Sequence, residues 1–340
     1  MRTSPTRLKL GQPPVRLLAV VLGILCVITV ILSLSVGSTG FEPLLSLGSD
    51  PVAAQILWDV RAPRTVGALL TGGLLGLAGA VAQGLFRNPL ADPFLLGSAS
   101  GASLGVAVLL VGFGVSPVAT QWLIKLGLTG AAFIGAVLAV LLTLSLARGV
   151  QQTLRLLLAG VIVGVVLGAL TSLLSLTRPD ILQAMQAFML GSTAFVSWSA
   201  CAIMAIVWLA CTATGIAFAR GLDGLALGEA TATSMGLPVS TLRAVLIATL
   251  ALASGTAVAH TGLIAFVGLA SPHLVRAIVH TRHAWLLPLA SLMGALLLSL
   301  ADLFARGLLA PQELPVGVLT ALLGGGYLMW LMNRRGVTRD

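Results

Sequence analysis

Long apolar runs make up most of the chain, and short polar or basic stretches separate them. A helix needs about 20 mostly apolar residues to cross the hydrocarbon core of a membrane. Ten runs come close to this length, and each predicts a spanning helix. These runs cover residues 16–36, 65–86, 95–114, 122–147, 154–176, 196–219, 240–260, 262–280, 285–309 and 315–332. The pattern therefore predicts an all-α membrane protein, a polytopic bundle of about ten transmembrane helices.

One polar interruption is much longer than a tight turn. It covers residues 221–238, with the sequence GLDGLALGEATATSMGLP, and lies between two apolar runs. Gly228 can break this stretch, and Glu229 suits the positive N-terminal end of a helix. Gly236, followed two residues later by a proline, is typical of a helix end. We therefore expect a short helix from Glu229 to Met235, outside the membrane.

The composition agrees with a membrane protein. The chain of 340 residues is 58% hydrophobic and 9% charged, whereas soluble domains carry about 25% charged residues. The formal net charge is +9, but the basic residues stand at the ends of apolar runs. Aromatic residues make up 5% of the chain and do not alternate with basic ones, so no platform for stacking bases is visible. We therefore exclude nucleic acid as a partner and expect membrane lipid around the bundle.

The basic residues also predict the orientation of the bundle. Ten spans place both termini on one side, and cytoplasmic loops of membrane proteins are rich in lysine and arginine. With both termini in the cytoplasm, most of the 19 basic residues lie inside. The exceptions, predicted on the outside, are Arg61, Arg64, Lys125, Arg178 and Arg306. We therefore expect a cytoplasmic tail at 1–15, a single transmembrane domain at 16–332 and a second cytoplasmic tail at 333–340.

Glycines recur at every fourth position in two of the apolar runs. One set is Gly97, Gly101 and Gly105, and the other is Gly160, Gly164 and Gly168. Four residues are about one helical turn, so each set makes a smooth strip along one helix face. Close helix packing is the simpler interpretation of these strips. A surface against which a neighbouring helix slides is the alternative.

The sequence offers no convincing motif for covalent chemistry or nucleotide binding. GASLG (101–105) matches GxSxG, but it lies in a small-residue membrane helix with no recognisable His/Asp set. Nothing matches HExxH or GxxxxGK[ST], so neither a zinc protease nor ATP binding by that loop is predicted. We interpret the three cysteines as buried apolar residues and the four histidines as structural or solvated groups. We therefore expect this chain to be no enzyme and to bind no cofactor and no metal. A membrane enzyme with an unrecognised site is the alternative.

One acid opens a different alternative. Ion-driven carriers keep ionisable groups at membrane depth, and Asp302 is the best candidate for that place. Arg306 follows four residues later, one turn away on the same helix face, so an ion pair is the simpler interpretation. The alternative function is an ion-coupled secondary transporter that uses Asp302.

Five stretches together resemble the permease subunits of bacterial ABC importers for ferric siderophores, haem and vitamin B12. They cover most of the chain in order. They are RAPRTVGALLTGGLLGLAGAVAQGLFRNPLADPFLLGSASGASLG (61–105), LLLAGVIVG (156–164), LALGEATATSMGLP (225–238), GLIAFVGLASPHLVR (262–276) and PQELPVGVLTALLGG (311–325). The resemblance identifies the family but leaves the substrate open.

The resemblance implies a type II ABC importer permease fold and a homodimer in the bacterial cytoplasmic (inner) membrane. Two ATP-binding-cassette ATPase subunits on the cytoplasmic side carry ATP and Mg, and a periplasmic or lipid-anchored substrate-binding protein docks outside. Transport by alternating access is implied. The substrate order that we expect is a ferric siderophore first, haem second and cobalamin third, since this is how common each is in the family.

The resemblance also assigns roles to residues at matching positions. Arginines that meet glutamates of the binding protein match Arg61, Arg64 and Arg306. The segment that couples to the ATPase matches residues 221–238, with Leu225, Leu227, Gly228, Glu229, Ala230, Thr231, Met235 and Gly236 as its contact residues. The helix that lines the pathway matches Leu157, Gly160, Gly164, Gly168 and Ser172, with Arg178 at its outer end. Structural motif positions match Gln83, Asn88, Pro89, Asp92, Pro93, Pro272, His273, Pro315 and Gly317.

Arg178 has two interpretations: it helps to admit an anionic chelate, or it is a plain interfacial arginine. The chain departs from the family pattern at two places. Gly324-Gly325-Gly326 stands where Gly-Ala-Pro is usual, and Phe188 stands where tryptophan is usual.

Overall fold

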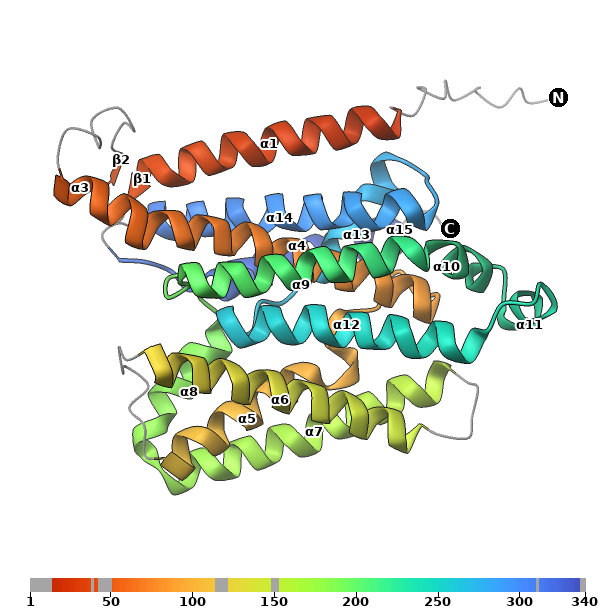
Figure 1. Ribbon diagram of the computed structural model, residues 1–340, viewed down its shortest axis with the longest axis horizontal. Coiled ribbons are helices and arrows are strands. Elements are labelled where there is room, and N and C mark those ends of the chain that lie inside the picture. Colours follow the sequence, from red (N-terminus) through yellow and green to blue (C-terminus); the bar gives the residue numbers. More distant parts are fainter. Residues whose placement is uncertain are drawn as a thin grey trace.

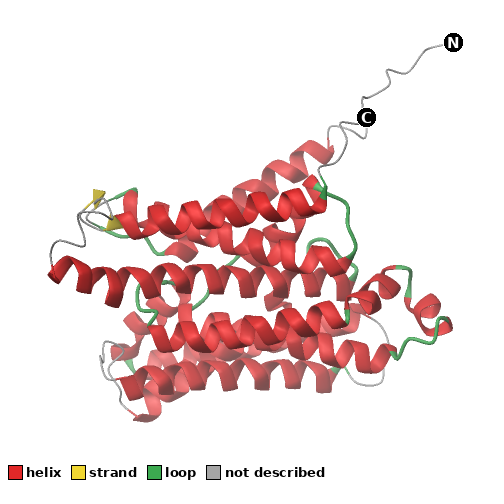
Figure 2. Cartoon of the chain, turned by 45° about the horizontal axis from the view of Figure 1, so that its top comes forward, coloured by secondary structure: helices red, strands yellow, loops and turns green. Residues whose placement is uncertain are grey.

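The computed structural model describes residues 14–37, 40–41, 51–113, 122–147, 153–309 and 312–336. Helices that run roughly side by side make up most of the fold (Figures 1 and 2). The long helices are α1 (Val15–Ser35), α4 (Ala62–Phe86), α5 (Ser98–Phe113), α6 (Trp122–Leu146), α7 (Thr153–Thr177), α9 (Trp198–Ala217), α12 (Val239–Thr261), α14 (His283–Gly307) and α15 (Val316–Gly336).

Shorter elements connect the long helices, mostly at the two ends of the bundle. They are β1 (Val36–Gly37), β2 (Gly40–Phe41), α3 (Pro51–Ile56), η1 (Leu57–Arg61), η2 (Pro93–Leu96), η3 (Pro179–Ile181), α8 (Leu182–Leu190), α10 (Ala219–Ala226), α11 (Glu229–Ser234) and α13 (Val267–Ile278). The antiparallel pair β1–β2 and helix α3 lie at one end, which we call the arginine end. Helices α10 and α11 lie at the opposite end, which we call the α11 end (Figure 1).

An apolar helix forms at each of the ten predicted ranges, and seven of the helices in the described part of the chain are long and apolar enough to cross a membrane. The α4 span begins at Pro51, because α3, η1 and α4 follow one another without a break. Helix α5, predicted at 95–114, has 16 residues, and the apolar part of α15 covers Val316–Tyr327. The prediction of an all-α membrane protein is confirmed.

The predicted span at 262–280 is shorter than expected. Helix α12 ends at Thr261, and Gly262 has a positive φ of 69°, which breaks the helix. Residues 262–266 are not helical, and α13 has only 12 residues. A helix of that length covers about 18 Å, well below the thickness of a bilayer core. The continuous apolar composition of this run hid the break.

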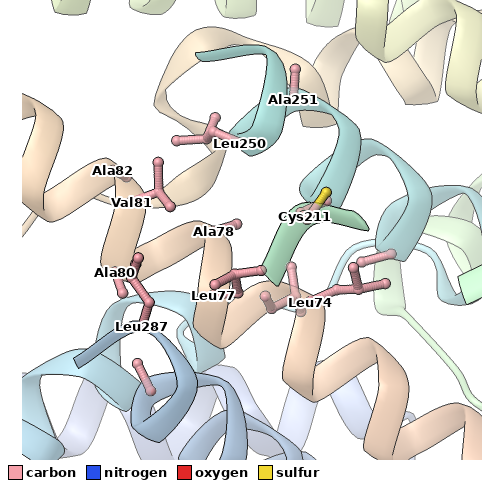
Figure 3. Packing of buried hydrophobic residues seen from close by; sticks show 14 of the residues in the cluster. Leu74, Leu77, Ala78, Ala80, Val81, Ala82, Cys211, Leu250, Ala251 and Leu287 are labelled. Carbon is pink, nitrogen blue, oxygen red and sulfur yellow. The ribbon is translucent and has the colours of Figure 1, made fainter. Parts of the chain in front are cut away.

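Helix α4 forms the centre of the bundle and packs against α9, α12, α13 and α14. Glycines allow these close approaches, because a Cβ at Gly76 would overlap the Ala290 carbonyl of α14. A Cβ at Gly79 would likewise overlap the Gly268 carbonyl of α13. The other face of α4 inserts leucines into the main core cluster, where Figure 3 shows Leu77 beside Cys211 of α9.

Helices α5, α6 and α7 form a second group at the side of this core. The glycine strip on α5 packs tightly, since a Cβ at Gly101 would overlap the Gly135 carbonyl of α6. The strip on α7 is packed only at its start, where Gly160 touches the Leu95 carbonyl. Gly168 has open space around it. The two strips, similar in sequence, therefore differ in their surroundings.

Candidate functional sites at the two ends of the bundle

A cluster of charged side chains occupies the arginine end. Arg64, in the first turn of α4, has a side chain that is only 9% exposed. Its Nε and Nη2 atoms each donate to Asp302 Oδ1 over 3.1 Å, and its Nη1 atom donates to Glu313 Oε2 over 2.7 Å. Arg64 thus bridges α14 and the segment before α15.

Asp302 lies at the centre of this cluster, and its side chain is fully buried in α14. Its Oδ2 atom lies 3.0 Å from Arg306 Nη2, so the predicted ion pair one helical turn apart is present. The Thr193 hydroxyl also donates to Asp302 Oδ1. Both carboxylate oxygens of Asp302 therefore face cations, which is how a buried ion pair is held together.

Arg306 is oriented by the end of α1. Its Nη1 atom donates to the carbonyl oxygens of Ser33 and Val36 over 3.1 Å each, and its Nη2 atom donates to the Ser33 hydroxyl. Arg61 lies nearby with an exposed fraction of 9%, and its guanidinium packs so closely on Gly37 that a Cβ there would overlap it. Three arginines and two acids thus meet at this end.

The three arginines predicted at the outer surface are buried in the structure, each less than 10% exposed. Sequence reasoning brought Arg61, Arg64 and Arg306 to one end of the bundle, but it missed Glu313, Thr193 and Ser33. Glu313 lies in the family stretch 311–325, but local pattern does not show that these three residues meet the arginines, because they come from three other segments of the chain. Docking of a partner at these arginines stays a prediction.

The polar interruption at the α11 end has the predicted form. Gly228 has φ 109° and separates α10 from α11, which begins at Glu229. Gly236 has φ 78°, and α12 begins at Val239 directly after Pro238. The predicted helix ends one residue early, because Met235 caps it.

The exposed side of this interruption is built from small residues and two large apolar side chains. Leu227 is 66% exposed and Met235 is 60% exposed, although both lie in a polar stretch of the sequence. Ala230, Thr231 and Gly236 are also exposed, whereas Leu225 is buried at 3%. Leu227 and Met235 flank α11, so both ends of this short helix present an exposed apolar side chain.

An ion pair and a carboxylate–imidazole contact tie α11 and α10 to the long helices. The guanidinium of Arg243 in α12 binds the Glu229 carboxylate with two parallel hydrogen bonds of 2.8 Å each. The Asp223 carboxylate accepts a hydrogen bond of 3.1 Å from the His283 backbone N–H and lies 2.6 Å from His283 Nδ1. Asp223 thereby caps the start of α14. The sequence predicted a dipole role for Glu229 but did not predict either pairing.

Helix α7, which carries the predicted pathway residues, has a largely exposed apolar face. Within its membrane-spanning part, Arg155–Thr177, only 22% of the apolar stretch is buried against the rest of the chain. Val161, Val165 and Leu173 are each more than half exposed, and Ser172 and Arg178 are exposed as well. Leu157 and Gly164 are half-buried, and Gly160 is buried. The structure therefore leaves this face of α7 open to lipid or to another chain, and the pathway role stays a prediction. The side chain of Lys125 lies outside the described residues.

The structural motif positions form local contacts near α4, α13 and α15. Gln83 donates to the Leu269 carbonyl over 3.1 Å and accepts from Arg276, which fastens α4 to α13. Asn88 accepts from the Leu90 N–H over 2.9 Å. These contacts fit the structural role that the resemblance implies. The remaining positions lie in or near short elements. Pro89 precedes η2, and Pro93 is its first residue. Pro272 lies within α13, the ring centroid of His273 lies 5.9 Å from that of Tyr327, and Pro315 and Gly317 stand at the start of α15.

Asp92 caps the short helix η2 and is electrostatically unusual. Its Oδ1 atom accepts from the Phe94 N–H over 2.8 Å. Burial raises the pKa of its carboxyl to about 6, and the Phe94 N–H offsets part of that rise. Asp92 lies between α4 and α5, outside the membrane-spanning helices.

The two departures from the family pattern, at Phe188 and Gly325, both lie beside the non-helical segment 262–266. Phe266 has φ 69°, and a Cβ at Gly324, where glycine is also usual in the family, would overlap its side chain. Gly325 has only a distant contact with the same ring, at 3.8 Å from an added Cβ. The Phe188 carbonyl accepts from the Leu263 N–H over 3.0 Å, which joins α8 to the segment that bears Phe266. Glycine at 324 is therefore required by Phe266.

Comparison with known proteins agrees with this architecture. Residues 25–334 match the model of the FecCD transport family. The chain is 38% identical over 329 residues to the hemin transport system permease protein HmuU of Yersinia pestis, covering 94% of this chain and 97% of the relative. It is 39% identical over 323 residues to the vitamin B12 import system permease protein BtuC of Escherichia coli, covering 93% and 94%.

Solved structures share the fold. The inward-facing conformation of a metal-chelate type ABC transporter matches with a TM-score of 0.81 and 31% identity, over 94% of this chain and 99% of that chain. The complex of PsaBC from Streptococcus pneumoniae with a Fab matches with a TM-score of 0.54 and 21% identity over 77% of this chain, which supports the fold alone.

Proposed function

Because the chain belongs to the FecCD transport family, we propose that it is the membrane-spanning permease of an ATP-driven importer for a metal chelate. The match of almost the whole chain to two import permeases is the observation that carries the proposal. The relatives are named for hemin and for vitamin B12. Haem and cobalamin are therefore proposed beside the ferric siderophore that we expect first, and a separate ATPase supplies the energy.

The two ends of the bundle take different partners in this proposal. The α11 end, with exposed Leu227 and Met235, is the surface that an ATP-binding-cassette subunit covers in the cytoplasm. The arginine end faces the periplasm and receives a substrate-binding protein, since arginine pairs well with carboxylates. The open apolar face of α7 is proposed to meet a second copy of the chain and to line the pathway between the copies. ATP and Mg bind to the partner, and this chain binds no cofactor.

We propose that alternating access is driven through the links at the α11 end. Movement of the ATPase subunits displaces α10 and α11, and the Glu229–Arg243 ion pair and the Asp223–His283 contact carry that displacement to α12 and α14. The pathway between the two α7 helices then opens to one side of the membrane at a time. An apolar, glycine-containing lining suits a large chelate that must not be held tightly.

An ion-coupled transporter fits the structure less well. Asp302 is fully buried and pairs with Arg64 and Arg306, so it is engaged in holding three segments together. A coupling carboxylate has to exchange its ion with water on each side of the membrane.

Uptake by the reconstituted importer tests the proposal. The permease, its ATPase subunit and its binding protein are placed in liposomes and offered a ferric siderophore, haem or cobalamin. We expect uptake of one of these probes to require ATP on the side of the liposome membrane that carries the ATPase. Uptake is expected to continue when a proton uncoupler is added. Uptake that proceeds without the ATPase and stops with the uncoupler would contradict the proposal.

A further inference from the structure

Arg64 and Arg306 at the arginine end are already bound to acids of the same chain. Arg64 uses its Nε and Nη2 atoms on Asp302 and its Nη1 atom on Glu313. Its side chain is 9% exposed. Three of its five N–H donors are used in this way and little of the side chain is exposed, so a partner's carboxylate gains room at Arg64 when one of these two acids moves away.

The two acids differ in how firmly they are held. Asp302 is fully buried within α14 and also contacts Arg306 and Thr193. Glu313 belongs to the non-helical segment before α15, and 32% of its side chain is exposed. Within the described residues, its hydrogen-bond partner is Arg64. Of the two acids, Glu313 is therefore the one that another acid can displace, because water can solvate it as it leaves.

The charge of the cluster favours replacement of Glu313 by another acid. Arg64 and Arg306 share the carboxylate of Asp302, and Glu313 is the second acid on Arg64. Removal of Glu313 leaves Arg64 with only this shared carboxylate in a largely buried place, which is costly. An incoming carboxylate that takes the Nη1 position restores the same charge-assisted hydrogen bond.

We propose that Glu313 is an internal stand-in for the carboxylate of the substrate-binding protein: it occupies Arg64 Nη1 in the free permease and is displaced when that protein docks. The inference rests on the proposed function, because it requires a binding protein that presents an acid at this end. Arg64 then becomes accessible only while an acid is there to replace Glu313.

This arrangement predicts that neutralisation of Glu313 strengthens binding of the substrate-binding protein, although Glu313 belongs to the docking site. While Glu313 competes for Arg64, the apparent affinity for the partner is the intrinsic affinity multiplied by the fraction of molecules in which the site is free. Removal of the competing charge therefore strengthens docking. If Glu313 only supported the fold or bound the partner directly, its neutralisation would weaken docking.

The test measures binding of the substrate-binding protein to the complete permease–ATPase complex in lipid nanodiscs. We expect Glu313→Gln to lower the dissociation constant about threefold to tenfold, and Glu313→Asp, which is one methylene shorter, to have a smaller effect in the same direction. Arg64→Ala is expected to raise the dissociation constant at least tenfold. Thermal melting of each complex shows that the variants are folded.

Asp59→Asn is the matched control. Asp59 is an exposed acid in η1 at the same end, so this variant removes the same charge without touching Arg64. We expect it to leave docking unchanged. Equal strengthening by Asp59→Asn, or no strengthening by Glu313→Gln, overturns the role of Glu313. If Arg64→Ala also leaves docking unchanged, the proposed docking site itself is wrong, so the two failures are distinguishable.

Discussion

At the scale of single residues, backbone contact at glycines decides where the helices of the core can lie. Gly72 and Gly76 of α4 face the backbone of α14, and Gly79 faces the backbone of α13. A side chain cannot rotate out of such a contact, because the obstacle is a carbonyl group on the neighbouring helix. The sequence shows that these glycines exist but not which of them touch a neighbour.

Gly79→Ala is predicted to destabilise the protein. The new methyl group overlaps the Gly268 carbonyl, and overpacking of this kind costs about 1–3 kcal/mol. Gly23→Ala in α1 is the matched control, since no atom lies within 4 Å of the added Cβ. Thermal unfolding in detergent is expected to show a lower Tm for Gly79→Ala and no loss for Gly23→Ala. Equal Tm values for the two variants would show that α4 and α13 can separate freely.

Asp92 is predicted to make stability depend on pH. Its pKa rises from an ordinary value near 3.8 to about 6 in the folded chain, so the folded state holds its proton more tightly. Stability is therefore full below pH 4 and is lost as the pH rises through 6, by at most about 3 kcal/mol. Asp92→Asn keeps an acceptor for the Phe94 N–H and removes the charge.

Melting curves between pH 4.5 and 8 measure this effect. We expect the Tm of Asp92→Asn relative to the unmodified protein to increase up to about pH 7 and then to stay constant. Asp59→Asn, at an exposed acid, is expected to follow the unmodified protein throughout. A constant difference between the Asp92→Asn and unmodified curves would mean that Asp92 is solvated in the folded chain.

At the scale of elements, the sequence predicted α11 to within one residue, whereas it predicted a longer helix than α13. Glycines with positive φ enclose α11 at both ends, and glycine, glutamate and proline mark such a helix in the sequence. The non-helical residues 262–266 stand at the start of the run predicted as one span from 262 to 280. Gly262 could have been the signal, but a glycine inside an apolar run is equally compatible with helix packing.

The link between α11 and α12 is expected to transmit movement. Arg243→Glu and Glu229→Arg each place like charges against each other, while the double variant restores the pair in reverse. We expect each single variant to hydrolyse ATP in the reconstituted importer with uptake lowered about tenfold, and the double variant to regain most of the uptake.

Uptake per ATP hydrolysed is the quantity to measure, together with the amount of ATPase that co-purifies. Restored uptake in the double variant separates a role in the pair from a simple loss of stability. If the single variants keep the normal ratio of uptake to ATP hydrolysis, α11 acts on the bundle through α10 and Asp223 instead.

At the scale of the whole molecule, α4 is the central helix around which the other helices of this FecCD transport family member pack. Four long or half-length helices pack around α4, and α5, α6 and α7 attach at the side. This leaves α7 exposed along an apolar face, to an extent similar to α1, α6 and α9. The two ends of the bundle differ in chemistry: one gathers buried charges, and the other presents exposed apolar and small side chains.

The sequence by itself determined the all-α membrane class, the approximate positions of the helices, the shape of the segment around α11 and the family. Those features depend on local hydrophobicity, helix-breaking residues and motifs that can be read along the chain. Only the tertiary structure decided that Arg64 and Arg306 are buried on Asp302, that Glu313 binds Arg64, and that Arg243 and His283 hold the α11 end. The reason is physical: each of these pairs except Arg306–Asp302 joins segments from different parts of the chain, so packing, and not local pattern, selects the partner of each charge.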